Sequence, residues 1–338
     1  MKRWLTALCM AAVFAAAATA AWAWQTYETT MSRPLVAAGS EPAQITVARG
    51  DTLAGIARRL VREERLKAAW PLRLYGRYTG DAARIKAGEY RIAPGTSATG
   101  LLRAMVTGDV IQHELTIVEG WTARQLFDAV ANHDALEHTL ALDDPQAVMA
   151  ALGHPDQKAE GRFLPETYHF PRGTSDRDFL QRAYRAMNSA LADAWEGRAD
   201  DLPLENPDDA LILASIIEKE TGVAGERARI AGVFARRLRR GMRLQTDPTV
   251  IYGLGEGFDG NLTRADLRRD NPYNTYTRAG LPPTPIALPG RDSLHAAVHP
   301  ADGDALYFVA DGKGGHVFSS TLEAHNRAVR RYQLNGGQ

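Results

Sequence analysis

The sequence has a single cysteine, Cys9, among its 338 residues. No disulfide can therefore form within the chain, and a cysteine-based metal site is excluded because such sites need several thiolates. The nine histidines are scattered, without the His-Glu-x-x-His spacing of a zinc site. The sequence therefore predicts a fold held together by its apolar core, with no metal site.

Net charge is a second property that the chain lacks. Lysine and arginine total 40, aspartate and glutamate also total 40, and the formal net charge is zero. The basic side chains are interspersed with acidic ones and do not form the basic stripe that a phosphate backbone requires. We therefore expect no nucleic-acid partner. With 45% hydrophobic residues, the chain can bury a large core and form more than one domain.

One long uncharged stretch lies near the amino terminus. Residues 4–24 contain no charged side chain, carry tryptophans at both ends and follow two basic residues. As a helix, this stretch would cross a hydrocarbon core of about 30 Å. We favour a single-pass anchor in the inner (cytoplasmic) membrane, with residues 1–3 in the cytoplasm and the large remainder outside. The alternative is a cleaved signal peptide, because residues 21–23 read small-x-small.

An internal repeat organises the middle of the chain. ITVARGDTLAGIARRL (residues 45–60) aligns with LTIVEGWTARQLFDAV (115–130), each an alternating run followed by a threonine-capped amphipathic helix. A second pair of similar segments comprises residues 88–102 and 166–180, in each of which Gly-Thr-Ser begins a helix after a short strand. Residues 45–110 therefore resemble a small βα module of the LysM kind. Such a module would serve either in glycan binding or as a spacer.

The most informative helix begins near residue 206. Asn206 suits its N-cap and Pro207 its first helical position. At helical spacing Glu218 lies on the apolar face, whereas Lys219 and Glu220 point elsewhere. Desolvation would raise the pKa of Glu218 and keep it protonated near neutral pH, as a proton donor requires. The alternative is a structural glutamate paired with a buried arginine.

Two polar segments follow that helix. The first is a turn before Pro248 that offers several hydrogen-bonding groups at one place, and the second is a proline-rich loop over residues 271–290. Aromatic rings together with amide groups suit the binding of a sugar, although core packing is the alternative for any single tyrosine. The candidate ligand-binding residues are Gln245, Thr246, Asp247, Asn271, Tyr273, Asn274 and Tyr276.

Five motifs give the chain a family resemblance. They are ASIIEKETG (214–222), RLQTDPTVIYGLG (243–255), NPYNTY (271–276), LPPTPI (281–286) and YFVADGKGGHVFSSTLEAHN (307–326). Their order and spacing resemble those of the endolytic murein transglycosylase, or YceG-like, family. The resemblance covers essentially the whole chain beyond the membrane segment. It implies cleavage of the glycosidic bond between N-acetylmuramic acid and N-acetylglucosamine within peptidoglycan strands, leaving 1,6-anhydro ends.

The resemblance also implies roles for particular residues. The catalytic acid of the family is the glutamate of the EKET motif, which we place at Glu218, and the turn at Gln245 belongs to the glycan cleft. The implied activity needs no cofactor, terminates the elongation of nascent strands, and makes cell-wall synthases candidate partners. One alternative is a hydrolase that uses Asp247 as a second carboxylate. Another is a non-enzymatic peptidoglycan-binding scaffold for those synthases.

These patterns together predict an α+β protein. It would be membrane-anchored, with a LysM-like βα module followed by a mixed α/β catalytic domain that has a helical core. His316 and His325, in the last motif, are expected to have structural roles. The expected boundaries are a tail at 1–3, an anchor at 4–24, a linker at 25–44, the module at 45–110, an intermediate α+β region at 111–205 and a catalytic region at 206–338. The expected elements include a helix at 176–195, a helix at 224–240 whose many arginines face solvent, and a hairpin at 307–318.

Overall fold

The computed structural model describes residues 2–334. Met1 of the expected tail and the last four residues of the expected catalytic region lie outside the described residues. The chain forms two compact units: the first comprises residues up to 113 together with 169–173, and the second comprises residues 114–168 and those from 174 onward. Both units mix helices with short strands, so the α+β prediction is confirmed.

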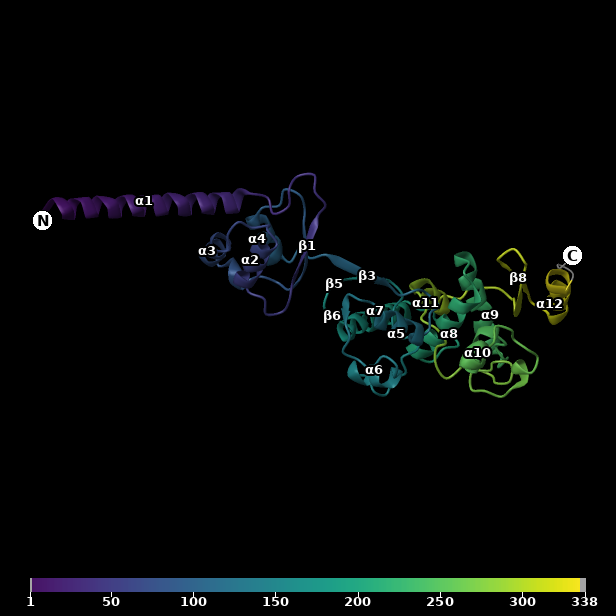
Figure 1. The fold of residues 1–338 in the computed structure, drawn as a ribbon. Helices are drawn as coiled ribbons and strands as arrows, with labels where there is room; N and C mark the ends of the chain where they lie inside the picture. The colour runs from purple at the N-terminus through teal and green to yellow at the C-terminus, as the bar shows by residue number, and fades with distance from the viewer. Residues whose placement is uncertain (1, 335–338) are drawn as a thin grey trace. The chain divides into compact units, whose positions relative to one another are not determined.

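Helix α1 (Lys2–Ser32) is the long helix at the amino terminus (Figure 1). Its segment Ala7–Ser32 has a mean hydropathy of 1.7 and is long and apolar enough to cross a membrane. The expected linker at 25–44 is wrong in part, because the helix continues through Ser32. Leu35 and Val36 then enter the core of the first unit.

The first unit pairs strand β1 (Ala43–Val47) with strand β2 (Gly88–Ile92) in antiparallel register, with Ile45 opposite Tyr90. Its helices are α2 (Leu53–Arg62), α3 (Trp70–Tyr78) and α4 (Ala98–Thr107). Alternate strand residues such as Ile45 and Val47 are buried, as the period of two predicts. Gly76 lets α3 pack closely, since a Cβ there would collide with the side chain of Leu53.

Both pairs of similar segments form a strand followed by a capped helix in the structure. Thr52 caps α2 after β1, and Thr122 caps α5 (Ala123–Ala131) after strand β3 (Gln112–Thr116). Ser97 caps α4 after β2, and Ser175 caps α7 (Asp176–Glu196) after strands β5 (Thr167–Pro171) and β6 (Thr174–Ser175). In each case the side-chain oxygen accepts a backbone N–H of the first helical turn, which fixes where the helix begins.

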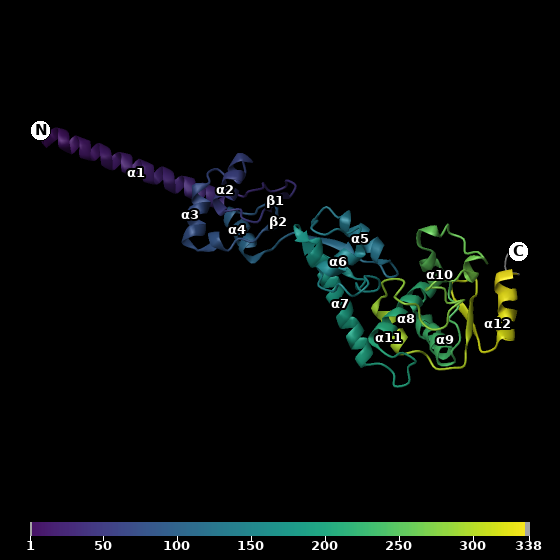
Figure 2. The ribbon, with the colours of Figure 1, turned by 90° about the horizontal axis from the view of Figure 1, so that it is seen from below.

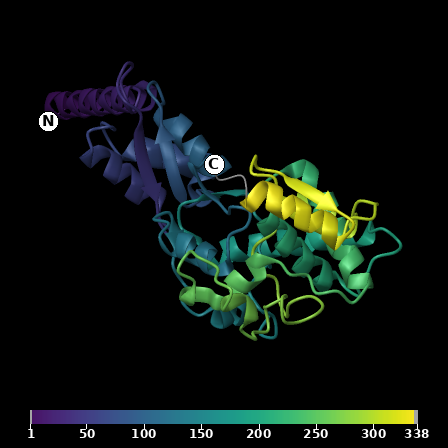
Figure 3. The ribbon, with the colours of Figure 1, turned by 90° about the vertical axis from the view of Figure 1, so that its right-hand side faces the viewer.

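Three further two-stranded sheets accompany the helices. Strand β3 pairs with β5, β4 (Leu136–Glu137) runs parallel to β6, and β7 (Tyr307–Ala310) pairs antiparallel with β8 (His316–Ser319). The last pair is the hairpin expected at 307–318. Helix α12 (Leu322–Val329) lies beside this hairpin, as the yellow elements of Figure 3 show.

The core of the second unit surrounds helix α8 (Pro207–Glu220). Helices α7, α9 (Arg227–Arg239) and α11 (Arg291–Val298) pack against it (Figure 2). Every residue of α8 from Ala210 to Ile217 is buried, so this helix is apolar all round and forms the centre of the unit. The helical core predicted for this region is therefore present. The remaining helical elements are α6 (Pro145–Ala151), α10 (Asp247–Leu254), η1 (Asp81–Ala83), η2 (Ala224–Glu226), η3 (Gly255–Gly257), η4 (Asp266–Arg268) and η5 (Arg330–Leu334).

Candidate active site

The last turn of helix α8 carries the two glutamates of the EKET motif on different sides. Asn206 caps the helix by accepting the N–H of Asp209 at 3.0 Å, and the helix ends at Glu220, where Thr221 becomes extended. Residues two positions apart on a helix are rotated by about 200°. Glu218 and Glu220 therefore face different surroundings, and each can be assessed separately.

Glu218 is held by protein groups. Its Oε2 accepts the backbone N–H of Gly290 at 2.9 Å, and its Oε1 lies 3.7 Å from an Nη of Arg227. Its side chain is only 6% exposed, so the predicted burial is present. Arg227 also reaches Glu119 at 3.6 Å and Asp292 at 3.3 Å. Glu218 thus has the environment of the alternative weighed from the sequence, a glutamate paired with a buried arginine.

Glu220 lies in a different environment from the one predicted. It points away from the face of Glu218, as predicted, but its carboxylate is enclosed by protein and accepts a hydrogen bond from the hydroxyl of Thr246. Burial raises the pKa of Glu220 to about 7; the hydrogen bond from Thr246 opposes this rise, and the negative charge of Asp247 adds to it. A carboxyl group with this pKa is partly protonated at neutral pH. Glu220 is therefore a glutamate of the EKET motif whose pKa is raised by burial.

A cavity of about 470 Å³ opens beside Glu220. One part of its wall comes from the segment that leads into α10, and another part comes from the β7–β8 hairpin and α12. Glu218 is not among its lining residues. Polar and aromatic groups that line it are Glu220, Arg237, Gln245, Asp247, Tyr276, Tyr307, Phe308, His316, His325 and Asn326.

Comparisons with known proteins agree with the motifs. Residues 45–331 match the YceG-like family. The chain belongs to the YceG-like family. It is 31% identical over 325 residues to the endolytic murein transglycosylase of Bacillus subtilis, covering 90% of this chain and 89% of that protein. It is 28% identical to the protein of the same name from Streptococcus pneumoniae D39, covering 73% of this chain and 51% of that one.

A solved structure is also similar. The crystal structure of a yceG-like protein from Listeria monocytogenes superposes with a TM-score of 0.54 at 31% identity. The match covers 86% of this chain and 99% of that one. The fold and the order of motifs are therefore those of the YceG-like family.

Three of the predicted ligand-binding residues line the cavity of this YceG-like chain. They are Gln245, Asp247 and Tyr276. The hydroxyl of Tyr276 donates to Asp247 at 2.6 Å, and burial raises the pKa of that hydroxyl. Thr246 is buried and does not line the cavity, but its hydroxyl donates a hydrogen bond to Glu220, which does. The segment predicted as a turn is the start of α10, with Thr246 at the N-cap position.

The other three predicted residues have their polar groups engaged by the protein, and they do not line the cavity. Asn274 is 1% exposed and donates to the carbonyls of Asp266, Leu267 and Arg269. The amide of Asn271 donates to Gly253 at 2.9 Å, and the hydroxyl of Tyr273 lies 2.9 Å from that of Thr284. Their amides and rings thus organise the proline-rich loop.

Arg237 is a site residue that the sequence interpretation missed. It lies on α9 among arginines that were expected to face solvent, yet it is buried and donates to the carbonyls of Leu306 at 2.6 Å and Leu244 at 2.8 Å. It also reaches the side chain of Gln245 at 3.4 Å. Gln245 has a positive φ of 52°, an unfavourable conformation that these contacts help to maintain. The apolar period of α9, which also buries Phe234, was the available signal.

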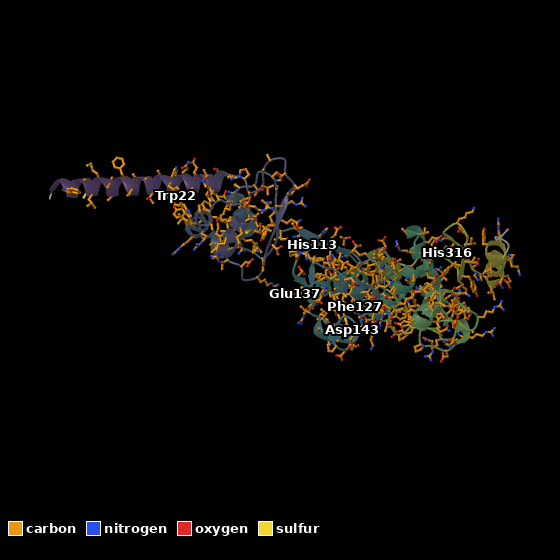
Figure 4. The ribbon with its side chains drawn as sticks, viewed as in Figure 1. Trp22, His113, Phe127, Glu137, Asp143 and His316 are labelled. Carbon is orange, nitrogen blue, oxygen red and sulfur yellow. The ribbon has the colours of Figure 1, made fainter. Side chains whose placement is uncertain are left out.

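The two histidines of the last motif, His316 and His325, both line the cavity. His316, labelled in Figure 4, lies 2.7 Å from Glu226. Although burial opposes it, hydrogen bonds from His316 hold the pKa of Glu226 below its usual range. Burial lowers the pKa of His325, and the nearby charge of Arg237 adds to this effect. Within residues 2–334, no group of three or more His, Cys, Asp or Glu side chains is placed to hold a metal ion.

Proposed function

We propose that this chain cleaves the bond between N-acetylmuramic acid and N-acetylglucosamine within peptidoglycan strands and leaves 1,6-anhydro ends. Two relatives named endolytic murein transglycosylase support this reaction. The observation that carries the proposal is Glu220, an enclosed carboxyl with a pKa near 7 beside a cavity lined with amide, aromatic and carboxylate groups. Such a cavity suits a polyhydroxylated ligand.

We assign the proton donor to Glu220 rather than to Glu218. A general acid must be protonated at working pH and must reach the leaving oxygen. Glu220 meets both requirements because it lines the cavity and its pKa is raised. Glu218 does not line the cavity; it accepts the N–H of Gly290 and lies beside Arg227, so its carboxylate is engaged by protein groups.

One carboxyl group can carry both halves of this reaction. Glu220 would protonate the departing glycosidic oxygen and then accept the proton of the 6-hydroxyl as that oxygen closes the anhydro ring. The acetamido group of the substrate or local dipoles would stabilise the positive charge that develops on the sugar. No water enters the products. Asp247 already accepts the hydroxyl of Tyr276, which favours a positioning role over that of a second catalytic carboxylate.

We further propose that α1 anchors the enzyme in the cytoplasmic membrane with both units outside the cytoplasm. Trp4 and Trp24 are 80% and 68% exposed and lie at the ends of the uncharged stretch, where interfacial tryptophans are favoured. An anchored enzyme reaches glycan close to the membrane, where strands are made. Action on nascent strands beside a synthase follows from this placement. If the helix is instead removed, the enzyme would be released into the medium.

The test compares two substitutions of the same kind. Purified Glu220→Gln and Glu218→Gln proteins are incubated with sacculi and with nascent glycan, and anhydro ends are measured by mass spectrometry. Glu220→Gln should lose at least about 100-fold in rate, since general acid catalysis contributes 10²–10⁴-fold. Glu218→Gln should keep substantial activity, and circular dichroism should show that both proteins are folded.

Three results would overturn parts of the proposal. Full activity of Glu220→Gln together with inactivity of a folded Glu218→Gln would return the catalytic role to Glu218. Reducing ends in place of anhydro ends would identify a hydrolase and implicate Asp247. Binding of glycan without any cleavage by the unmodified protein would favour the non-enzymatic scaffold.

A further inference from the structure

Helix α1 is longer than a bilayer requires. Its 31 residues extend about 46 Å at 1.5 Å per residue, whereas a hydrocarbon core is about 30 Å thick. Trp4 and Trp24 are about 30 Å apart by the same measure, which matches that thickness. If residues 4–24 span the membrane, the part of α1 beyond Trp24 lies at the outer headgroup layer.

This outer part of α1 packs against helix α3 of the same unit. Thr26 and Thr30 are buried, and α1 contacts both α3 and α4. The ring of Tyr27 stacks on that of Trp24 with centroids 6.3 Å apart, and it lies 6.3 Å from the ring of Trp70, the first residue of α3. The start of α3 is therefore held close to Trp24, the residue that marks the membrane boundary.

Helix α3 exposes an apolar stripe in addition to its buried face. Trp70, Leu74 and Tyr78 recur every four residues and share one side of the helix, with Leu74 55% and Tyr78 91% exposed. The buried face of α3 consists of other residues, Pro71, Leu72 and Gly76. Together with α1 the stripe forms an open apolar groove of about 720 Å³, lined by Ala20, Ala23, Trp24, Tyr27, Trp70, Leu74, Tyr75 and Tyr78.

The charges on α3 suit a phospholipid surface. Arg73 and Arg77 are exposed and adjoin the stripe, and α3 contains no acidic residue. Tryptophan and tyrosine are enriched where headgroups meet acyl chains, and arginine is attracted to anionic headgroups. An aromatic and aliphatic face flanked by arginine is the composition of a helix that lies in the membrane interface.

We propose that the stripe formed by Trp70, Leu74 and Tyr78 inserts into the headgroup layer of the bilayer that α1 spans. The first unit would then rest on the membrane surface through a second contact, with phospholipid filling the groove between α1 and α3. This inference depends on the proposal that α1 is retained as a membrane anchor, and the test separates the two.

The chain has one cysteine, which allows single labels to be placed in the full-length protein. Cys9 is changed to serine, and a cysteine is introduced by Phe14→Cys in α1, Leu74→Cys or Tyr78→Cys in α3, or Gln44→Cys as a control. Gln44 is an exposed residue of β1. Each protein is labelled with an environment-sensitive fluorophore and reconstituted into vesicles of phosphatidylcholine and phosphatidylglycerol.

Labels at positions 14, 74 and 78 should show blue-shifted emission and quenching by spin-labelled lipids, those in α3 most strongly by lipids labelled near the headgroup. The control at position 44 should be quenched by aqueous iodide alone. Iodide quenching at both 74 and 78, with position 14 inside the bilayer, would overturn the inference and leave the anchor intact. Iodide quenching at position 14 would overturn both. Protection of α3 only at high protein-to-lipid ratios would identify a second copy of the chain, and not lipid, as the occupant.

Discussion

The pH dependence of glycan cleavage should respond in opposite directions to changes at two neighbours of Glu220. Thr246→Val removes the hydroxyl that donates to the carboxylate, so the pKa of Glu220 should rise. Asp247→Asn removes a negative charge that favours the protonated form, so the pKa should fall. The alkaline limb of the rate profile should therefore move to higher pH in the first variant and to lower pH in the second.

The size of the effect follows from the environment of Glu220. With a pKa of about 7 this group is half protonated at pH 7, whereas at the ordinary value of 4.5 about 0.3% would be protonated. Burial thus increases the amount of competent acid by about 150-fold. A hydrogen bond to a charged group contributes about 1.5–3 kcal/mol, and 1.4 kcal/mol is a factor of ten in ionisation. With a pKa of about 7, roughly 9% of Glu220 is protonated at pH 8, so Thr246→Val should contain about six- to tenfold more protonated Glu220 at that pH.

The assay is kcat/KM for release of anhydro ends between pH 5 and pH 9, because its pH profile reports groups of the free enzyme. Absolute rates are of secondary interest, since either substitution can also alter glycan binding. Tyr276→Phe is a useful control because it removes the partner of Asp247 and keeps the charge. If the alkaline limb of the kcat/KM profile lies at the same pH in the unmodified protein and in both variants, Glu220 is not the titrating acid.

Three further predictions concern stability. Burial raises the pKa of Glu160 from 4.5 to about 7, so the folded protein binds more protons than the unfolded one between these values and loses stability as pH rises through them. Glu160→Gln should remove a loss on the order of 3 kcal/mol, seen as a flatter dependence of Tm on pH. Gly161→Ala should destabilise more than Gly153→Ala in urea unfolding. Both have positive φ, but a Cβ at 161 would lie 2.6 Å from Pro285 whereas the space at 153 is open. Arg237→Met should cost about 2–4 kcal/mol in the same measurement, because buried carbonyls lose their donor. An unaltered pH dependence of Tm would contradict the first prediction, equal losses in the two glycine variants the second, and an unchanged unfolding midpoint for Arg237→Met the third.

Local signals in the sequence located the helices well. Caps at Thr52, Ser97, Thr122, Ser175 and Asn206 marked five helix starts, since a side-chain acceptor for the first N–H groups is encoded within a few residues. The hairpin in the last motif was equally local. The end of α1 was not found, because residues 25–32 are polar and their helical state depends on packing against the first unit.

The sequence predicts Glu218 as the acid, whereas the surroundings of the two glutamates in the structure lead us to propose Glu220. Helical periodicity can identify the buried side of an amphipathic helix. Because α8 is buried on all sides, its periodicity does not tell which of Glu218 and Glu220 lies beside the cavity. The distinction depends on Arg227, Gly290 and Thr246, which come from other segments. Partners that are distant in sequence are not visible in a local pattern. For the same reason Arg237 was mistaken for a surface residue.

The three consecutive residues at the end of α8 each fasten a different part of the second unit. Glu218 holds the backbone at Gly290, Lys219 holds the carbonyl of Gly120 at 3.1 Å, and Glu220 holds Thr246. One short turn thus joins segments that lie 26, 72 and 99 positions away along the chain. A change at Lys219 would therefore lower activity by shifting the segment at Gly120 while the carboxyl of Glu220 itself stays intact.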